Sequence, residues 1–396
     1  MRGGLRPVGA FVCVLALSAG AASAQTRYVA FGDSITEGVG DEPEREEKGY
    51  PPRLESLLQQ AGRNAVVVNR GVGAERTPEG LSRIDSVLDE GGDVLLLMEG
   101  TNDITRFISH ETTSFNLRAM ADRAEARGFE VVHATLVPRI PDARVDADNI
   151  GNNRLNQRIR DIAGRFDRDL ADHFEVFSTL PNPFATHYFG SPEDGVGHPN
   201  ARGYDLMART WLEVIVGEDT VPPVAGRTSP NYGAVDVSPA GSVSVDVWDF
   251  GSGLDLAATS LVLNGVEVSA DLTGGTRGAN LRYRPPRPFQ GTIHVALRSR
   301  DQATPANTVD REVSYFRIEG APEEGLRGDI DGDGRVDGAD LVRLALAFGA
   351  GRGESRYAAA ADLDSSGRVD GQDLAILASN FGRTDSEGQA LVAGSR

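Results

Sequence analysis

The chain of 396 residues contains a single cysteine, Cys13. This cysteine stands inside the first apolar stretch, residues 8–17, so a chain that loses this stretch has no thiol and cannot depend on disulfides for stability. No apolar run reaches the roughly 18 residues that suggest a membrane-spanning helix. Positive charge is also scarce: 40 Lys and Arg face 58 Asp and Glu, and the formal net charge is −18. That balance argues against a nucleic acid partner and favours neutral or cationic ligands and divalent metal ions.

The first residues have the pattern of a secretory signal. Arg2 and Arg6 precede the short apolar stretch, and Ala22-Ser23-Ala24 offers a small-residue cleavage site. We therefore expect a signal peptide over residues 1–24, with cleavage after Ala24, and a secreted, extracellular protein.

Residues 25–218 alternate between short β-branched runs and segments with helical periodicity. The expected strands cover residues 28–31, 65–69, 93–98, 130–134 and 174–177. The expected helices cover residues 51–61, 78–90, 115–127, 149–166 and 201–216. This alternation predicts an α/β domain, in which a parallel sheet lies between two layers of helices. Ligands bind such sheets at the carboxyl ends of the strands.

Residues 219–320 have an all-β pattern instead. Polar and apolar residues alternate over residues 243–248, and Asn264-Gly265 is a hairpin signal. Short strands over about 100 residues predict a β-sandwich. The segment resembles bacterial Ig-like modules in the stretches Pro222-Pro223, Asp249-Phe250-Gly251-Ser252-Gly253 and Ser314-Tyr315-Phe316. Its aromatic residues are few, which favours a passive spacer over a sugar-binding module; they include Trp248, Tyr283 and Phe289.

An internal repeat follows. A segment that begins at Asp329 recurs at Asp362, 33 positions later, and each copy runs into a segment with one apolar helical face. The apolar faces comprise Leu341, Leu344, Ala345 and Phe348 in the first copy and Leu374, Leu377, Ala378 and Phe381 in the second. We assign this module to residues 325–384 and expect a disordered tail over residues 385–396.

Four short polar motifs follow strands or precede a helix of the α/β segment. They are Gly32-Asp33-Ser34, Asn69-Arg70-Gly71, Gly100-Thr101-Asn102-Asp103 and Asp194-Gly195-Val196-Gly197-His198-Pro199-Asn200. The first three stand just after expected strands. Because the carboxyl ends of parallel strands share one edge of the sheet, we expect these three motifs to converge there.

The residue types in these motifs suit nucleophilic catalysis by serine. The Ser34 hydroxyl needs a neighbouring base, here His198, whose tautomer and orientation Asp194 would set. Donors must also face the oxygen on which negative charge develops. The Ser34 backbone N–H and the Asn102 side-chain amide are two such donors, and an N–H of the loop after the second strand is a third.

Together, and in this order, the motifs resemble those of the SGNH, or GDSL-like, hydrolase family over about residues 27–216. The resemblance implies a flavodoxin-like three-layer fold and ester hydrolysis without a metal or other catalytic cofactor. It also implies catalytic roles for Ser34, Asn102 and His198.

The chain departs from the family pattern in two places. Ala74 stands where the family usually has an oxyanion glycine, so Gly71, Gly73 and Ala74 all remain candidates for the third donor. The last motif has one extra residue, Gly197, between the acid and the base. The glycines in this loop would allow it to bulge and restore the contact.

The repeated segment fits a calcium loop, which has oxygen ligands at positions 1, 3, 5, 7, 9 and 12 and glycine at position 6. Gly334 and Gly367 stand at the glycine position. The first loop would bind Ca²⁺ through Asp329, Asp331, Asp333, the Arg335 carbonyl, Asp337 and Asp340. The second would use Asp362, Asp364, Ser366, the Arg368 carbonyl, Asp370 and Asp373.

An aspartate at position 12, a loop followed by a helix and a Phe-Gly ending resemble type I dockerin modules over about residues 328–383. We expect this module to need Ca²⁺ for folding, because its apolar core is small and its loops are strongly acidic. The resemblance implies a cohesin-like receptor, bound through loop positions 10 and 11. Those positions hold Gly338-Ala339 and Gly371-Gln372, so a receptor elsewhere or an intramolecular role stays open.

The expected function is that of a secreted serine esterase. Acetylated polysaccharide is the favoured ester substrate, because dockerin modules accompany enzymes that act on polysaccharides. A lipid or aryl esterase is the alternative among enzymes. A non-catalytic adhesion or scaffold component is the alternative from another class.

Overall fold

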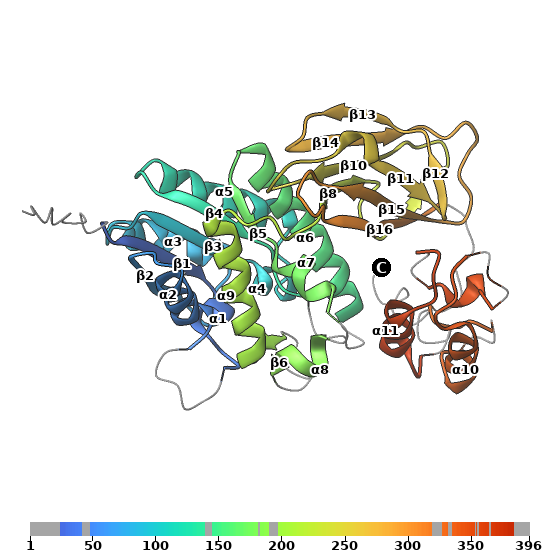
Figure 1. The fold of residues 1–396 in the computed structure, drawn as a ribbon, viewed down its shortest axis with the longest axis horizontal. Helices are drawn as coiled ribbons and strands as arrows, with labels where there is room; N and C mark the ends of the chain where they lie inside the picture. Colours follow the sequence, from blue (N-terminus) through green and yellow to red (C-terminus); the bar gives the residue numbers. More distant parts are fainter. Residues whose placement is uncertain are drawn as a thin grey trace, which may run out of the picture.

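The structure is a computed structural model. It describes residues 24–41, 48–138, 145–180, 183–189, 197–318, 327–331, 335–352, 354, 356–363 and 366–383. Apart from Ala24, the expected signal peptide lies outside these residues, as does the expected tail. The described residues form three units, each with its own apolar core (Figure 1). Among them, no helix combines the length and the apolar character that crossing a bilayer requires.

The first unit is built on a parallel sheet with the strand order β2-β1-β3-β4-β5. Its strands are β1 (Thr26–Gly32), β2 (Ala65–Gly71), β3 (Val94–Met98), β4 (Glu130–Ala134) and β5 (Asp169–Ala171). This order is that of flavodoxin-like folds, so the prediction of an α/β fold with a parallel sheet is confirmed. The whole of β3 is buried, as expected for a central strand covered on both faces.

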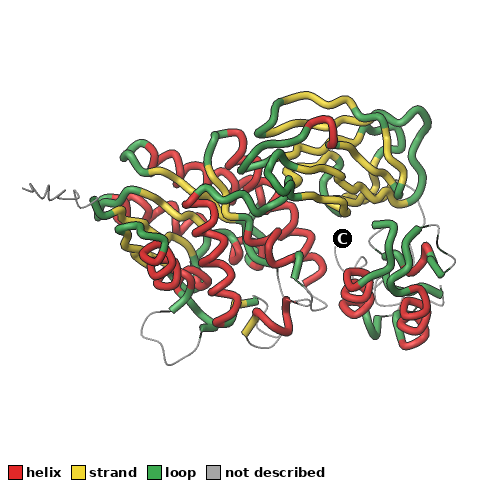
Figure 2. Tube along the Cα trace, in the orientation of Figure 1, coloured by secondary structure: helices red, strands yellow, loops and turns green. Residues whose placement is uncertain are grey.

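Helices cover both faces of this sheet (Figures 1 and 2). Helices α2 and α9 pack together on one face, and α3, α5 and α6 form the layer on the other. The long helices are α2 (Tyr50–Gln60), α3 (Thr77–Leu88), α5 (His110–Glu125), α6 (Val145–Arg165) and α9 (Ala201–Val216). The short elements are α1 (Ser34–Glu37), α4 (Thr101–Thr105), α7 (His173–Ser178), α8 (Pro183–His187), β6 (Tyr188–Phe189) and β7 (His198–Pro199).

The expectation of a strand over residues 174–177 was wrong. Those residues lie in α7, and the fifth strand is β5, a few residues earlier. Asp172 caps the helix, because its side chain accepts the backbone N–H of Glu175 at 3.0 Å. A strand of three residues is too short to show a period-two pattern, whereas the apolar residues of α7 imitate one.

The second unit consists of two sheets around a common core. One sheet has the order β13-β14-β10-β8 and the other β12-β11-β15-β16-β9. The strands are β8 (Val224–Ser229), β9 (Ala234–Val237), β10 (Val243–Trp248), β11 (Ser260–Leu263), β12 (Val266–Val268), β13 (Asp271–Gly274), β14 (Gly278–Tyr283), β15 (Thr292–Arg300) and β16 (Thr308–Ile318), with a 3₁₀ turn at Leu256–Ala258. Asn264 and Gly265 make the predicted hairpin, at φ +47° and +75°. Its assignment as an Ig-like module stays a prediction.

This sandwich rests on α6 of the first unit. The Trp248 indole packs where Gly164 has no side chain, and its Nε1 donates to Asp161 Oδ1 at 2.9 Å. Beside it, the Arg160 guanidinium donates to the Ala225 carbonyl at 3.0 Å. The two units therefore share a packed interface with specific polar contacts.

The third unit contains α10 (Gly338–Ala347), a 3₁₀ turn (Ala359–Ala361) and α11 (Gly371–Asn380). The two helices are 33 residues apart, as the repeat predicts. Their apolar faces are only partly buried. Leu344 and Leu377 are each 1% exposed, whereas Leu341, Phe348 and Phe381 are 40–52% exposed. The module thus keeps apolar side chains on its surface.

Candidate active site

Ser34 is the first residue of α1, directly after β1. Asp33 caps this short helix by accepting the backbone N–H of Ile35 at 2.9 Å. The N–H groups of a first helical turn have no acceptor within the helix, so the N–H of Ser34 is suited to bind an anion. The side chain is largely buried, as Ser34 is 7% exposed.

His198, which belongs to the C-terminal part of the domain's sequence, lies next to Ser34. Its Nε2 lies 2.9 Å from Ser34 Oγ. The histidine belongs to β7, which pairs antiparallel with β6. Asn200 holds this pair in place, because its side chain donates to the Tyr188 carbonyl at 3.1 Å and caps α9 through the N–H of Arg202 at 2.9 Å. Residues 164 positions apart thus form the hydrogen bond that a serine nucleophile and its base require.

The proposed orienting acid, Asp194, lies outside the described residues. The structure describes the chain again from Gly197, directly before β7. On the other side, Gly40 backs onto the histidine at φ +93°, and a Cβ there would lie 2.9 Å from His198 Cβ. Glycine at this position therefore gives the imidazole the room it occupies.

The loop after β2 was expected to supply an oxyanion donor. The N–H of Gly71 donates to Asn69 Oδ1 at 2.9 Å, and the N–H of Val72 donates to the Gly32 carbonyl at 3.0 Å. Within the described part of the chain, the N–H groups of Gly73 and Ala74 have no such acceptor. An N–H already bonded inside the protein is a poor oxyanion donor, so Gly73 and Ala74 are the better candidates.

Asn102 lies in α4, just after β3. Its Nδ2 donates to the Glu75 carbonyl at 2.8 Å. A side-chain amide has two N–H bonds, so one remains for an oxyanion. The three sheet-edge motifs therefore converge at the carboxyl edge of the sheet, as expected from their positions after β1, β2 and β3.

Asp103, the last residue of its motif, had no predicted role. It is fully buried, and its carboxylate accepts the backbone N–H of Thr77 at 2.9 Å and the Thr113 hydroxyl at 2.6 Å. These bonds tie α4 to the starts of α3 and α5. Asp103 therefore holds the segment that carries Asn102, and its position next to Asn102 was the only sequence signal for it.

Arg83 also holds the site in place, and the sequence did not predict this role. The Arg83 guanidinium binds both carboxylate oxygens of Glu75, at 2.6 and 2.5 Å. It also donates to the carbonyls of Gly32 at 3.3 Å and Arg70 at 2.9 Å, at the ends of β1 and β2. A bidentate arginine contact of this kind fixes geometry as well as charge. Arg83 thus joins the loop that bears Glu75 to the sheet edge that bears Ser34.

Glu99, directly before the third motif, was also missed. It is 1% exposed, and neither carboxylate oxygen has a hydrogen-bond partner among the described residues. Burial raises the pKa of Glu99 well above its usual value, and the charges of Glu75 and Asp33 raise it further. Burial and the two neighbouring carboxylates therefore disfavour the ionised form of Glu99. An added Cβ at Gly80 would lie 2.3 Å from its Oε2.

In the first repeat loop, Asp329, Asp331 and Asp340 come together, with one carboxylate oxygen of each within 4.8 Å of the others. Asp340 is fully buried and accepts the N–H of Ile330 at 2.6 Å and of Asp337 at 2.8 Å. Asp337 caps α10. Arg335 lies in the same loop, whereas Asp333 lies outside the described residues.

The second loop repeats much of this geometry. Asp370 caps α11 and donates its N–H to Asp373 Oδ2 at 2.7 Å. Asp362 is 5% exposed, and its Oδ1 is buried with no hydrogen-bond partner among the described residues. A buried carboxylate oxygen in that state fits a metal ligand. Ser366 Oγ bonds the Arg368 carbonyl at 3.0 Å, and Asp364 lies outside the described residues.

Two parts of the chain match known protein families. Residues 30–206 match the GDSL-like Lipase/Acylhydrolase family, and residues 327–381 match the Dockerin type I domain. The chain carries a GDSL-like lipase/acylhydrolase domain and a dockerin type I domain. The GDSL-like domain makes it a carboxylic ester hydrolase.

Individual relatives cover the GDSL-like domain. The chain is 28% identical to an arylesterase of Vibrio mimicus over 216 residues, which are 53% of this chain and 94% of the relative. Among solved structures it is similar to the lipase/acylhydrolase of Enterococcus faecalis, with 22% identity, a TM-score of 0.43 and coverage of 48% of this chain and 96% of the other. It is also similar to Axe2, an acetylxylan esterase of Geobacillus stearothermophilus, with 18% identity, a TM-score of 0.40 and coverage of 48% and 94%.

Proposed function

We propose that the chain is a secreted serine esterase that removes acetyl groups from polysaccharide. The observation that carries the catalytic part is the distance of 2.9 Å between Ser34 Oγ and His198 Nε2. The dockerin domain on the same chain supports the substrate and the extracellular location, because such modules attach enzymes to extracellular assemblies.

In the proposed reaction, Ser34 Oγ attacks the ester carbonyl carbon while His198 Nε2 takes the hydroxyl proton. The oxygen that becomes negative is bound by the N–H of Ser34, the free N–H of the Asn102 amide and an N–H of Gly73 or Ala74. The C–O bond to the alcohol then breaks, and His198 returns the proton to the leaving oxygen. Water hydrolyses the acyl-serine by the same proton transfers in reverse, and Asp194 orients the imidazole throughout.

We infer that the dockerin domain binds two Ca²⁺ ions through the carboxylates of its loops. In the first loop Asp329, Asp331 and Asp340 would hold the ion. In the second, Asp362 and Asp373 would do so. Bound Ca²⁺ supplies positive charge that offsets the repulsion among these carboxylates and stabilises the loops.

A cohesin-like receptor is the partner that this domain suggests. Gly338 and Ala339 at the start of α10 are exposed, and so are Leu341 and Leu346 on the helix and Phe348 at its C-cap. An exposed apolar surface next to small loop residues favours binding to a protein. This surface is therefore our candidate for the receptor contact.

Aryl esters are the second candidate substrate class. The observation that favours them is the similarity to the Vibrio mimicus arylesterase.

One experiment tests the reaction and another ranks the substrates. Incubation with a fluorophosphonate should add its phosphonyl group to Ser34, as located by peptide mass spectrometry, and His198→Ala should slow this labelling. Absence of labelling at Ser34 in the wild type would contradict its proposed role as the nucleophile. Acetate release from acetylated xylan should then exceed hydrolysis of phenyl esters, at equal ester concentration; the reverse order would favour the arylesterase assignment.

A further inference from the structure

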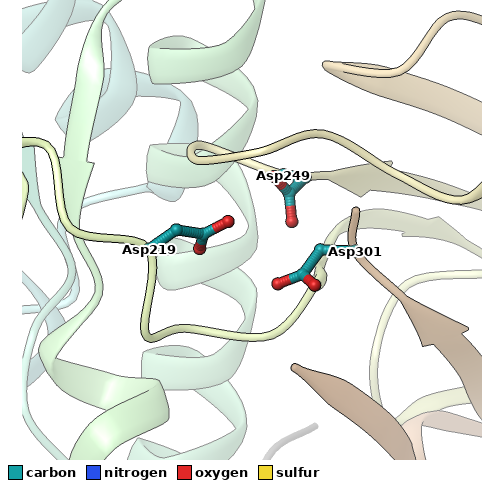
Figure 3. Close-up of side chains that lie close together, drawn as sticks. All are labelled: Asp219, Asp249 and Asp301. Atoms are coloured by element: carbon teal, nitrogen blue, oxygen red, sulfur yellow. The ribbon is translucent and has the colours of Figure 1, made fainter. Parts of the chain in front are cut away.

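Three aspartates converge where the GDSL-like domain joins the sandwich (Figure 3). Asp219 belongs to the segment between α9 and β8, Asp249 follows β10, and Asp301 follows β15. One carboxylate oxygen of each lies within 4.8 Å of the others. Asp249 and Asp301 are 3% and 2% exposed, so two of the three carboxylates are buried.

Neutral backbone and amide groups hold these side chains in place. Asp249 Oδ1 accepts the N–H groups of Gly251 at 3.1 Å and Gly253 at 2.6 Å. Gly251 also permits the close approach of Asp219, since a Cβ at this glycine would lie 2.1 Å from Asp219 Cγ. The carboxylate of Asp219 accepts the N–H of Ser252 at 2.6 Å. The turn over residues 249–253 therefore brings the carboxylates of Asp249 and Asp219 close together.

The third carboxylate is held from the opposite side. Asp301 Oδ1 accepts the N–H of Asn307 at 2.9 Å, and its Oδ2 accepts the Asn307 side-chain amide at 2.6 Å. The same Asn307 amide also donates to the Asp219 carbonyl at 3.1 Å. Asn307 thus links the interdomain segment to the loop that carries Asp301.

Asp249 Oδ2 is buried and has no hydrogen-bond partner among the described residues. The Asp249 side chain points toward those of Asp219 and Asp301 (Figure 3). Within the same part of the chain, no arginine or lysine forms an ion pair with any of the three aspartates; the nearby Arg277 and Arg300 pair with Asp167 and Asp255 instead. Burial raises the pKa of Asp249 to about 6, and the charges of Asp219 and Asp301 add to this effect. Three close carboxylates without a cation are unfavourable at neutral pH.

We propose that Asp219, Asp249 and Asp301 bind a Ca²⁺ ion at the junction between the GDSL-like domain and the sandwich. The donors are all oxygens, which suit a hard divalent cation. Calcium–oxygen bonds of about 2.3–2.6 Å place the ligands of one ion at most about 5 Å apart, and the three carboxylates satisfy that limit. The irregular loops around the cluster favour Ca²⁺ over Mg²⁺, which demands near-octahedral geometry.

The bound ion would link the GDSL-like domain to the sandwich. Asp249 and Asp301 come from different sheets of the sandwich, whereas Asp219 lies three residues beyond the end of α9. A bound ion would therefore hold the interdomain segment against both sheets. It would add to the contact of Trp248 with α6 in setting the position of the sandwich.

The test counts calcium ions bound to the full-length chain by equilibrium dialysis in metal-free buffer. Asp249→Asn and Asp301→Asn should each bind one Ca²⁺ fewer per chain than the wild type. Asp271→Asn is the matched control, since Asp271 is an exposed aspartate on β13 of the same sandwich, and its count should equal that of the wild type. The dockerin loops contribute equally to all these proteins, so the difference reports the junction alone.

Thermal unfolding distinguishes a variant that loses the ion from one that fails to fold. With chelator present, Asp249→Asn should unfold at or above the temperature of the wild type, because the variant removes a charge from the unpaired cluster. Added Ca²⁺ should raise the unfolding temperature of the sandwich in the wild type and not in Asp249→Asn. If Asp249→Asn does not fold, Asp219→Asn on the less buried segment gives the same comparison. An unchanged calcium count in folded Asp249→Asn or Asp219→Asn would overturn the proposal.

Discussion

The side-chain amide of Asn102 donates to the backbone carbonyl of Glu75 at 2.8 Å. This bond joins the motif after β3 to the loop after β2, and it leaves one N–H of the amide for the reaction. The Glu75 carboxylate is in turn held by Arg83. The direction of the Asn102 amide therefore depends on an ion pair between two residues outside the proposed catalytic groups.

Replacing Arg83 tests this dependence. Glu75 is 6% exposed, and in Arg83→Met its buried carboxylate would lack its cation. We therefore expect its loop to shift and Asn102 to lose its orientation. We expect kcat for p-nitrophenyl acetate to fall at least about tenfold, up to the roughly 10²–10³ that loss of one oxyanion donor costs. KM should change much less. Steady-state kinetics measures both.

The control is Arg127→Met, which breaks surface ion pairs on the far side of α3 and should leave kcat unchanged. Arg83→Lys keeps the charge but not the bidentate contact, and should lie between the wild type and Arg83→Met. A normal kcat in folded Arg83→Met would show that Glu75 does not need this support.

Ala74 carries a left-handed backbone conformation, with φ +60°. That conformation costs an L-residue about 1–2 kcal/mol, whereas glycine adopts it freely at some cost in chain entropy. We expect Ala74→Gly to retain kcat/KM and to unfold at an equal or slightly higher temperature. Ala74→Val should lower both, since a β-branched residue tolerates this region poorly. Equal losses in the two variants would contradict this account.

Two buried histidines should make the folding stability of the GDSL-like domain depend on pH in the acidic range. Burial lowers the pKa of both His133 and His173 to about 3, while the unfolded chain binds a proton at the ordinary value near 6.5. Between these values the unfolded state holds more protons than the folded state. Stability should therefore fall as the pH drops from about 6.5 toward 3, by about 1.4 kcal/mol per pH unit for each imidazole.

Urea unfolding at neutral and acidic pH measures this slope. His173→Phe keeps an aromatic ring at the edge of Trp211 and removes the titrating group, so its slope should be smaller by about one imidazole. His187→Gln, at a partly exposed position, should change the slope less. A wild-type slope retained in His173→Phe would show that His173 does not titrate as described.

Chelation should expose the dockerin domain to protease. Its two loops concentrate carboxylates around a small core, in which the described residues include six buried apolar side chains. Removal of Ca²⁺ therefore leaves charge repulsion that this core cannot offset. We expect limited proteolysis of the full chain in chelator to cut within residues 327–383, and Ca²⁺ to prevent this. Asp340→Asn should be cut even with Ca²⁺, whereas Asp310→Asn on the sandwich should behave as the wild type. Equal cleavage with and without chelator would contradict calcium-dependent folding.

Much of this architecture follows from local patterns. Buried strands such as β3 are continuous apolar runs, and the loop–helix repeat gives α10 and α11 at the same spacing. The strand prediction was wrong at β5, which has only three residues. The apolar residues of the neighbouring helix α7 were interpreted as a strand instead. Its polar cap, Asp172, stands at the true boundary.

The sequence predicted the proposed catalytic groups, Ser34, Asn102 and His198, because these residues stand in motifs with chemical meaning. The supports were not predictable in the same way. Arg83 acts through contacts with Glu75 and with the ends of β1 and β2, whereas Glu99 is buried directly after β3. No local pattern distinguishes either residue from an ordinary charged residue. The cluster of Asp219, Asp249 and Asp301 is likewise created only by folding, since its members come from three distant segments.

The most direct test of the central claim compares p-nitrophenyl acetate hydrolysis by the wild type, Ser34→Ala, His198→Ala and the double variant. If Ser34 and His198 act as one unit, each single variant should lose about 10⁴-fold or more in kcat, and the double variant should lose little beyond either single one. Wild-type turnover by folded Ser34→Ala would contradict the account.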